Sequence, residues 1–175
     1  MKKAILFLFF GLSYSLSAQV AIGKTVTSNS SVSLEFYDQA DNTKAIVLPW
    51  VTNTTTMTNV ALGTMVYDLQ DKKVKYFKNN TWLDWSVDTT GVANSTIQNS
   101  VSETTNAKVI ISENPNNDTT NGIMVLGDSN KAMVLPKVAN PHLTIYNPEP
   151  GTIVYDTYSK QLAVYNGSVW SFWKN

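Results

Sequence analysis

Residues 151–170 read GTIVYDTYSKQLAVYNGSVW, and residues 63–82 read GTMVYDLQDKKVKYFKNNTW. In both stretches an apolar run with valine and tyrosine leads to an aspartate and a polar turn, and a second such run leads to an asparagine and then a tryptophan. β-Branched and aromatic residues bounded by turn residues favour strands. Each stretch therefore predicts a β-hairpin, and the second is a copy of the first.

The duplication extends beyond the hairpins. KAIVLP at residues 44–49 recurs as KAMVLP at residues 131–136, and a stretch rich in Thr, Ser and Asn separates the two copies. We predict an all-β chain made of two homologous antiparallel β units, residues 19–87 and 108–175, joined by a linker at residues 88–107. Units of about 67 residues barely stabilise a core of their own, so we expect them to pack on each other or on other chains. The residues that recur identically at a spacing of 88 are Gly63, Thr64, Val66, Tyr67, Asp68, Lys72, Trp82 and Trp85.

The turns predict the register of the hairpins. Asn166-Gly167 favours a two-residue turn with positive φ angles, which would place Val164 opposite Val169 and Ala163 opposite Trp170. The first hairpin has Asn79-Asn80 in this region, which is a weaker turn signal.

In the first hairpin the corresponding register would place Lys75 opposite Trp82, with the aliphatic part of the lysine covering the indole.

The N-terminus has the features of a secretory signal peptide. Lys2 and Lys3 precede an apolar run at residues 4–12, and small residues lead to Ala18-Gln19. The run is too short to span a membrane, which takes about 20 residues. We predict a signal peptide at residues 1–18 and no membrane span in the mature chain. The protein would be secreted or at the cell surface, with the periplasm as the alternative.

Composition excludes several classes of function. The chain has 13 basic and 13 acidic residues, the basic ones are all lysines, and cysteine is absent. Nucleic-acid binding, thiolate metal sites and cysteine nucleophiles are therefore not expected. His142 is the single histidine and lies in a proline-flanked loop, which is weak evidence for a metal or a general base. We predict no catalytic residue, no metal and no cofactor.

Asp68 and Asp156 each follow a strand and precede a turn. One interpretation makes them a pair of catalytic or calcium-binding carboxylates. The interpretation we favour is that each carboxylate accepts backbone hydrogen bonds in its own turn, as aspartate commonly does.

The tryptophans and tyrosines suggest contact with a ligand or a partner. Their rings could stack on sugars, or they could cover the ends of small sheets that have little other core material. The candidate contact residues are Trp82, Trp85, Tyr165, Trp170 and Trp173.

These motifs carry a family resemblance. KAIVLP and KAMVLP with GTMVYD…W and GTIVYD…YNGSVW resemble a pattern in repeat-containing secreted and surface β proteins of bacteria with type IX secretion. The resemblance implies a fibre-like or adhesin-like protein. It also implies O-glycosylation at Asp-Thr motifs, for which Thr89 and Thr119 are the candidates.

We therefore expect an exported, non-enzymatic structural or adhesive module that acts through protein partners or self-association. The alternative is a carbohydrate-binding module that uses exposed Trp and Tyr side chains. A hydrolase built on Asp68 and Asp156 is a third hypothesis, and it needs the two carboxylates about 5–10 Å apart.

Overall fold

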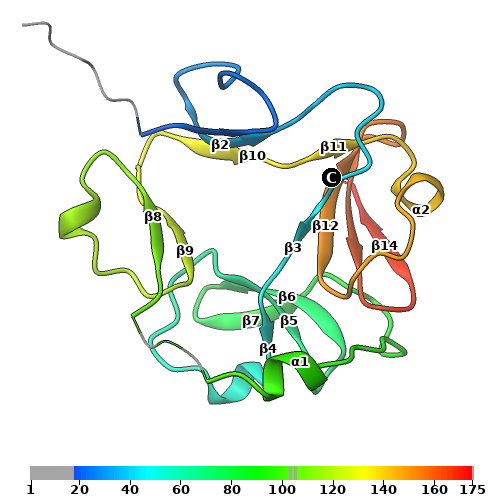
Figure 1. The fold of residues 1–175 in the computed structure, drawn as a ribbon. Helices are drawn as coiled ribbons and strands as arrows, with labels where there is room; N and C mark the ends of the chain where they lie inside the picture. Colours follow the sequence, from blue (N-terminus) through cyan, green and yellow to red (C-terminus); the bar gives the residue numbers. More distant parts are fainter. Residues whose placement is uncertain (1–17, 103, 105, 175) are drawn as a thin grey trace, which may run out of the picture.

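A computed structural model describes residues 18–102, 104 and 106–174 of the chain. The described part consists mostly of short strands with little helix, and the sheets follow one another around the molecule (Figure 1). The predicted signal peptide lies outside the described residues except for Ala18. Within the described part, no helix is long and apolar enough to cross a membrane.

The strands are short throughout. In the first half they are β1 (Val20–Ile22), β2 (Val32–Phe36), β3 (Ile46–Val47), β4 (Trp50–Val51), β5 (Met65–Asp68), β6 (Lys73–Lys78) and β7 (Thr81–Asp84). In the second half they are β8 (Val109–Ile111), β9 (Met124–Leu126), β10 (Ala132–Val134), β11 (Lys137–Val138), β12 (Thr152–Asp156), β13 (Gln161–Tyr165) and β14 (Trp170–Trp173). The short helices are α1 (Thr96–Asn99) and α2 (Pro141–Thr144), with 3₁₀ turns at Thr54–Thr56 and Pro115–Asn117.

The two predicted hairpins form, and they are copies of each other. Strands β5, β6 and β7 form one antiparallel ribbon, with β4 added in parallel to β5; β12, β13, β14 and β11 repeat this arrangement. The prolines that end the two KAxVLP motifs act alike. The carbonyl of Pro49 accepts from the Tyr67 amide at 2.8 Å, and that of Pro136 accepts from the Tyr155 amide at 2.9 Å. Proline cannot donate, but its carbonyl still ties the motif to the hairpin.

The two halves are not separate antiparallel units, so that prediction was wrong. Strand β3 of the first half pairs antiparallel with β12 of the second half, and β10 of the second half pairs in parallel with β2 of the first. Parallel ladders also join β1 to β2 and β8 to β9. The chain therefore follows a solenoid-like path in which the halves interleave. A period-2 pattern predicts a half-buried strand but does not identify the neighbouring strand.

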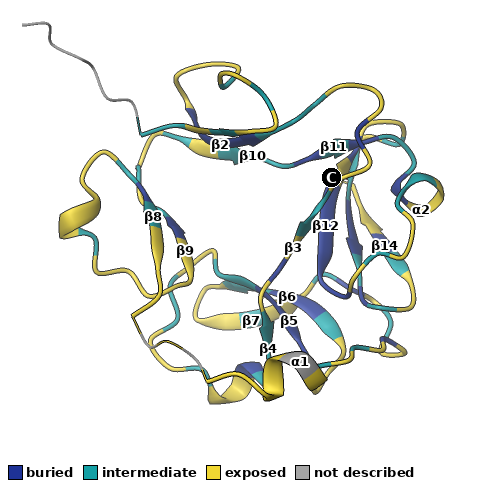
Figure 2. Ribbon diagram, in the orientation of Figure 1, coloured by how far each residue is buried: buried dark blue, intermediate teal, exposed yellow. Residues whose placement is uncertain are grey.

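One core cluster is shared by both halves. Leu48, Tyr67 and Val74 from the first half pack with Ile153 and Val164 from the second, and all five are buried. Figure 2 shows buried segments on β5, β6 and β12, which face the interior where the halves meet. A shared core of this kind adds stability to units of about 67 residues, which are marginal on their own.

The predicted registers were wrong in both hairpins. Tyr165 lies opposite Trp170, so the loop between them has four residues and not two. The cause is Asn166, whose side chain is buried and accepts from the Ser168 and Val169 amides at 2.9 and 2.7 Å. Its amide group also donates to the carbonyl of Asp88 at 2.9 Å, which ties the start of the linker to the hairpin.

The first hairpin has the shorter loop, of two residues, although Asn79-Asn80 predicts a tight turn less strongly than Asn-Gly does. Asn79 and Asn80 both adopt positive φ angles, and Lys78 lies opposite Thr81. Phe77 therefore faces Trp82, while Lys75 faces Asp84. Asparagine tolerates the left-handed region better than most residues, which allows this turn without glycine.

Candidate functional site

Asp68 closes the turn after β5. Its Oδ1 accepts from the Gln70 and Asp71 amides at 2.9 and 3.0 Å, and its Oδ2 accepts from the amide and hydroxyl of Thr54 at 2.9 and 2.6 Å. The Lys75 ammonium lies 3.5 Å from Oδ2. Burial alone would raise the pKa of Asp68, but these hydrogen bonds and the lysine hold it below its usual value.

Asp156 does the same after β12. Its Oδ1 accepts from the Asn140 and Tyr158 amides, each at 3.0 Å, and Ser159 donates its hydroxyl to Oδ2. Here too burial would raise the pKa, and the hydrogen bonds lower it. Asp68 and Asp156 belong to different sheets, and each carboxylate accepts from its own turn and from one neighbouring segment, at Thr54 and at Asn140 respectively. This geometry fits the interpretation of a turn-closing aspartate at both positions.

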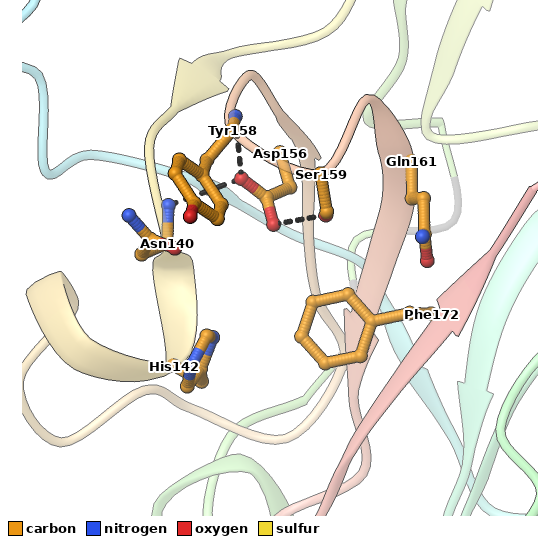
Figure 3. Close-up of a pocket in the computed structure, with 7 residues that line it drawn as sticks. All are labelled: Asn140, His142, Asp156, Tyr158, Ser159, Gln161 and Phe172. Carbon is orange, nitrogen blue, oxygen red and sulfur yellow. Dashed lines mark hydrogen bonds between the residues drawn. The ribbon is translucent and has the colours of Figure 1, made fainter.

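A surface pocket lies beside Asp156. Its cavity volume is about 390 Å³, and Figure 3 shows the His142 and Phe172 rings on one side and Tyr158 on the other. The His142 and Phe172 rings meet edge to face, with centroids 5.7 Å apart. The lining residues are Asn140, His142, Asp156, Tyr158, Ser159, Gln161 and Phe172. The only carboxylate in this lining is already held by the turn, so the pocket offers polar and aromatic contacts and not a free acid.

The five candidate aromatic residues lie on two ribbons. Trp82 and Trp85 follow β6, whereas Tyr165, Trp170 and Trp173 belong to β13 and β14. Of these five, Trp173 is the exposed one, at 43% of its surface, and the others are half-buried. Trp173 also donates its indole N–H to the carbonyl of Trp85, which joins the two ribbons at equivalent positions of the repeat.

Four of the five candidate rings lie against other aromatic rings. Trp85 stacks on Tyr76 with centroids 4.6 Å apart, Trp82 lies 5.1 Å from Phe77, and Tyr165 lies 5.3 Å from Trp170. Trp85 packs against the shared core, and Trp170 packs against a second cluster. This second cluster contains buried Val138, Val154 and Ala163.

A set of contacts that the sequence did not reveal joins the two halves. The Leu48 amide donates to the Gly151 carbonyl at 3.0 Å, and the Trp50 indole donates to the Pro150 carbonyl at 2.6 Å. The Tyr67 hydroxyl donates to the Asn166 carbonyl at 2.7 Å, and burial raises the pKa of Tyr67 to about 12. Leu48, Tyr67 and Gly151 recur between the repeats, but their recurrence does not show that one half covers the other.

The described residues contain no group of three or more His, Cys, Asp or Glu side chains that could hold a metal ion. Thr89 and Thr119, the candidate glycosylation sites, are both exposed. Each follows an aspartate that accepts the amide of the next threonine, Asp88 from Thr90 at 2.6 Å and Asp118 from Thr120 at 2.8 Å.

Comparison with known proteins gives one match. Residues 109–175 match the family model described as a phage tail like trimerisation region. The match covers less than half of the chain and coincides closely with the second repeat. No curated protein and no solved structure matches the chain. The description of this family names a trimerisation region and does not mention type IX secretion. The resemblance to surface proteins of bacteria with type IX secretion therefore stays a prediction.

Proposed function

We propose that this chain is a non-enzymatic structural module that assembles with copies of itself, as a homotrimer, in an exported fibre or surface appendage. The observation that carries the proposal is the match of residues 109–175 to a trimerisation region. The repeated hairpins support it, because the carboxylates of Asp68 and Asp156 close turns and the aromatic rings pack on the sheets.

The experiment is size-exclusion chromatography with light scattering on residues 19–175, repeated from nanomolar to high micromolar concentration. We expect a particle of three times the chain mass that dissociates on dilution. A monomer across the whole range would overturn the proposal.

Export is the second part of the proposal. It rests on the basic, apolar and small-residue segments of residues 1–18. N-terminal sequencing of the protein recovered from culture medium or an envelope fraction should begin at Gln19. An intact Met1 on a cytosolic protein would contradict export, while leaving trimerisation untouched.

A specific observation keeps carbohydrate binding as a second candidate function. The pocket in Figure 3 combines aromatic Tyr158 and Phe172 with the amides of Asn140 and Gln161, which is the mixture of ring faces and hydrogen-bonding groups that sugars require. A glycan array with the native chain and Tyr158→Ala tests it, with Tyr146→Ala as the control on an exposed tyrosine outside this pocket. Binding that Tyr158→Ala does not weaken would reject this site.

A further inference from the structure

The two halves use the same motif differently. In the first half, β3 lies in KAIVLP and borders β12 of the second half. In the second half, β10 lies in KAMVLP and borders β2. The strand in the first half that corresponds to β12 is β5. Strand β3 borders β12 on the edge opposite β13. The same edge of β5, opposite β6, pairs with β4 at Tyr67 and Asp68. At Thr64 and Met65 this edge pairs with no strand among the described residues.

The hairpin edge that can accept a KAxVLP strand is therefore covered in the second half, at residues 151–153, and uncovered by any described strand in the first half, at residues 63–65. A Cβ placed on Gly151 would lie 3.0 Å from the Tyr67 Cβ and 3.4 Å from the Leu48 carbonyl oxygen. A Cβ placed on Gly63, the equivalent residue, would lie more than 4 Å from every heavy atom in the described part of the chain, apart from its two chain neighbours. Gly151 is buried and Gly63 is exposed, although both have a φ of +85°. Leu62, beside Gly63, is 70% exposed.

Two residues that cover this edge show the opposite difference: they are buried in the first half, and their equivalents are more exposed in the second. Tyr67 of the first half is fully buried against the second half, whereas its equivalent, Tyr155, is 37% exposed. Leu48 is buried, and its equivalent Leu135 is half-buried. At the position of Trp50, which donates its indole N–H across the contact, the second half has Lys137, which also carries N–H donors.

The backbone edges agree with this asymmetry. Successive N–H groups of a strand point to opposite edges. The Leu48 amide points to β12, since it donates to Gly151, and the Ala132 amide points to β2, since it donates to Ser31 at 2.8 Å. The ladder between β10 and β2 shifts register between Ala132 and Met133, but the extra residue, Ser33, belongs to β2, so the alternation along β10 is kept. Leu135, the equivalent of Leu48, follows Ala132 by three residues, and its amide thus points away from β2. Strand β10 therefore presents outward the same edge that β3 uses to pair with β12.

A second pair of edges is also open. Strands β8 and β9 repeat the parallel pair β1 and β2, but no other described strand pairs with the far edge of β9, where β2 has β10. Met124 on β9 is 52% exposed, while Leu34, its equivalent on β2, is buried. The outer edge of β3 is likewise unpaired among the described strands, and Val47 there is 48% exposed.

We propose that copies of this chain associate head to tail by repeating the contact between their own halves: β10 of one copy pairs antiparallel with the Thr64–Met65 edge of the next, and β9 pairs with β3. The inference rests on the proposed self-association and identifies its surface. The contact is heterologous, because each copy uses two different faces. Heterologous contacts are the kind that close a three-fold ring, and exposed strand edges are common sites of such pairing.

The structure specifies a cross-link that tests this contact. In the contact between the halves, Val47 lies opposite Thr152. The equivalent pair between copies is Val134 with Thr64, a non-hydrogen-bonded antiparallel pair whose Cα atoms should lie about 4.5 Å apart, within the range of a disulfide. Figure 1 places β5 and β10 on opposite sides of one chain, so a disulfide between these positions must join two chains. The natural chain has no cysteine to interfere.

The experiment oxidises Thr64→Cys/Val134→Cys and separates the product on a non-reducing gel. We expect covalent dimers and trimers. The control, Thr64→Cys/Val169→Cys, should stay largely uncrosslinked because Val169 lies outside the proposed contact. A second variant, Tyr155→Asp, should weaken trimer formation by about 30-fold, whereas Tyr146→Asp, at a residue 87% exposed, should not.

The outcomes separate this inference from the proposed function. A natural chain that remains monomeric contradicts both. A natural chain that forms trimers, with no disulfide and no effect of Tyr155→Asp, overturns the head-to-tail contact alone. A disulfide ladder well beyond three chains supports the contact and contradicts closure at three.

Discussion

Leu48→Ala tests whether the two halves form one cooperative structure. Leu48 is 6% exposed and packs with Tyr67 and Val74 of its own half and with Ile153 and Val164 of the other. Removing a buried leucine side chain costs about 2–5 kcal/mol, which for a chain of this length lowers Tm by roughly 5–15 °C. We expect a single unfolding transition that shifts as a whole, because the cluster belongs to both halves.

The assay is urea unfolding combined with hydrogen exchange, read separately on peptides from β5–β6 and β12–β13. Both sets of amides should lose protection equally in Leu48→Ala. Leu143→Ala is the control, since Leu143 is 66% exposed and its truncation should change stability by less than about 0.5 kcal/mol. The chain should be assayed at one fixed low concentration, because self-association adds to apparent stability. Loss of protection confined to β5–β6 would refute the shared core.

Two further predictions concern the hydrogen bonds at the hairpins. Tyr67→Phe leaves the Asn166 carbonyl without its buried donor, so it should cost about 1–3 kcal/mol in urea unfolding; Tyr146→Phe should cost nothing measurable, and equal effects would argue against the hydrogen bond. Asp68 and Asp156 have folded-state pKa values below the unfolded value of 3.8, so their stabilising contribution is complete above that value and is lost as the pH falls through the folded pKa. The urea midpoint should therefore be flat above about pH 5 and fall in more acidic solution, and Asp156→Asn should reduce this fall. A midpoint that rises on acidification would contradict the assignment.

The sequence predicted local structure well where one residue type governs it. The repeated Gly-Thr-x-Val-Tyr-Asp runs form strands β5 and β12, each ending in a turn-closing aspartate, because β-branched and aromatic residues and an aspartate before a turn act largely through near neighbours. Asn166 shows where this fails. Its buried side chain donates to the carbonyl of Asp88 and accepts from the Val169 amide. The bond to Asp88 depends on tertiary packing. The hairpin loop therefore has four residues, whereas the Asn-Gly dipeptide alone predicts two.

Strand partners were the part that the sequence could not predict. KAIVLP and KAMVLP are nearly identical, yet β3 pairs antiparallel with β12 and β10 pairs in parallel with β2. The two motifs therefore pair through different partners although their residues are almost the same, so the partner is decided by the tertiary arrangement and not by the motif. Burial patterns alone carry no such information.

The pairing of β3 with β12 also bears on when the protein can fold. A ribosome releases residues 46–47 long before residues 152–156, so the first half waits for the C-terminal hairpin to be synthesised before its edge is completed. Closing so long a stretch of chain is slow. Until that hairpin is available, the edge of β3 that it covers stays unpaired, and exposed strand edges invite pairing with other chains.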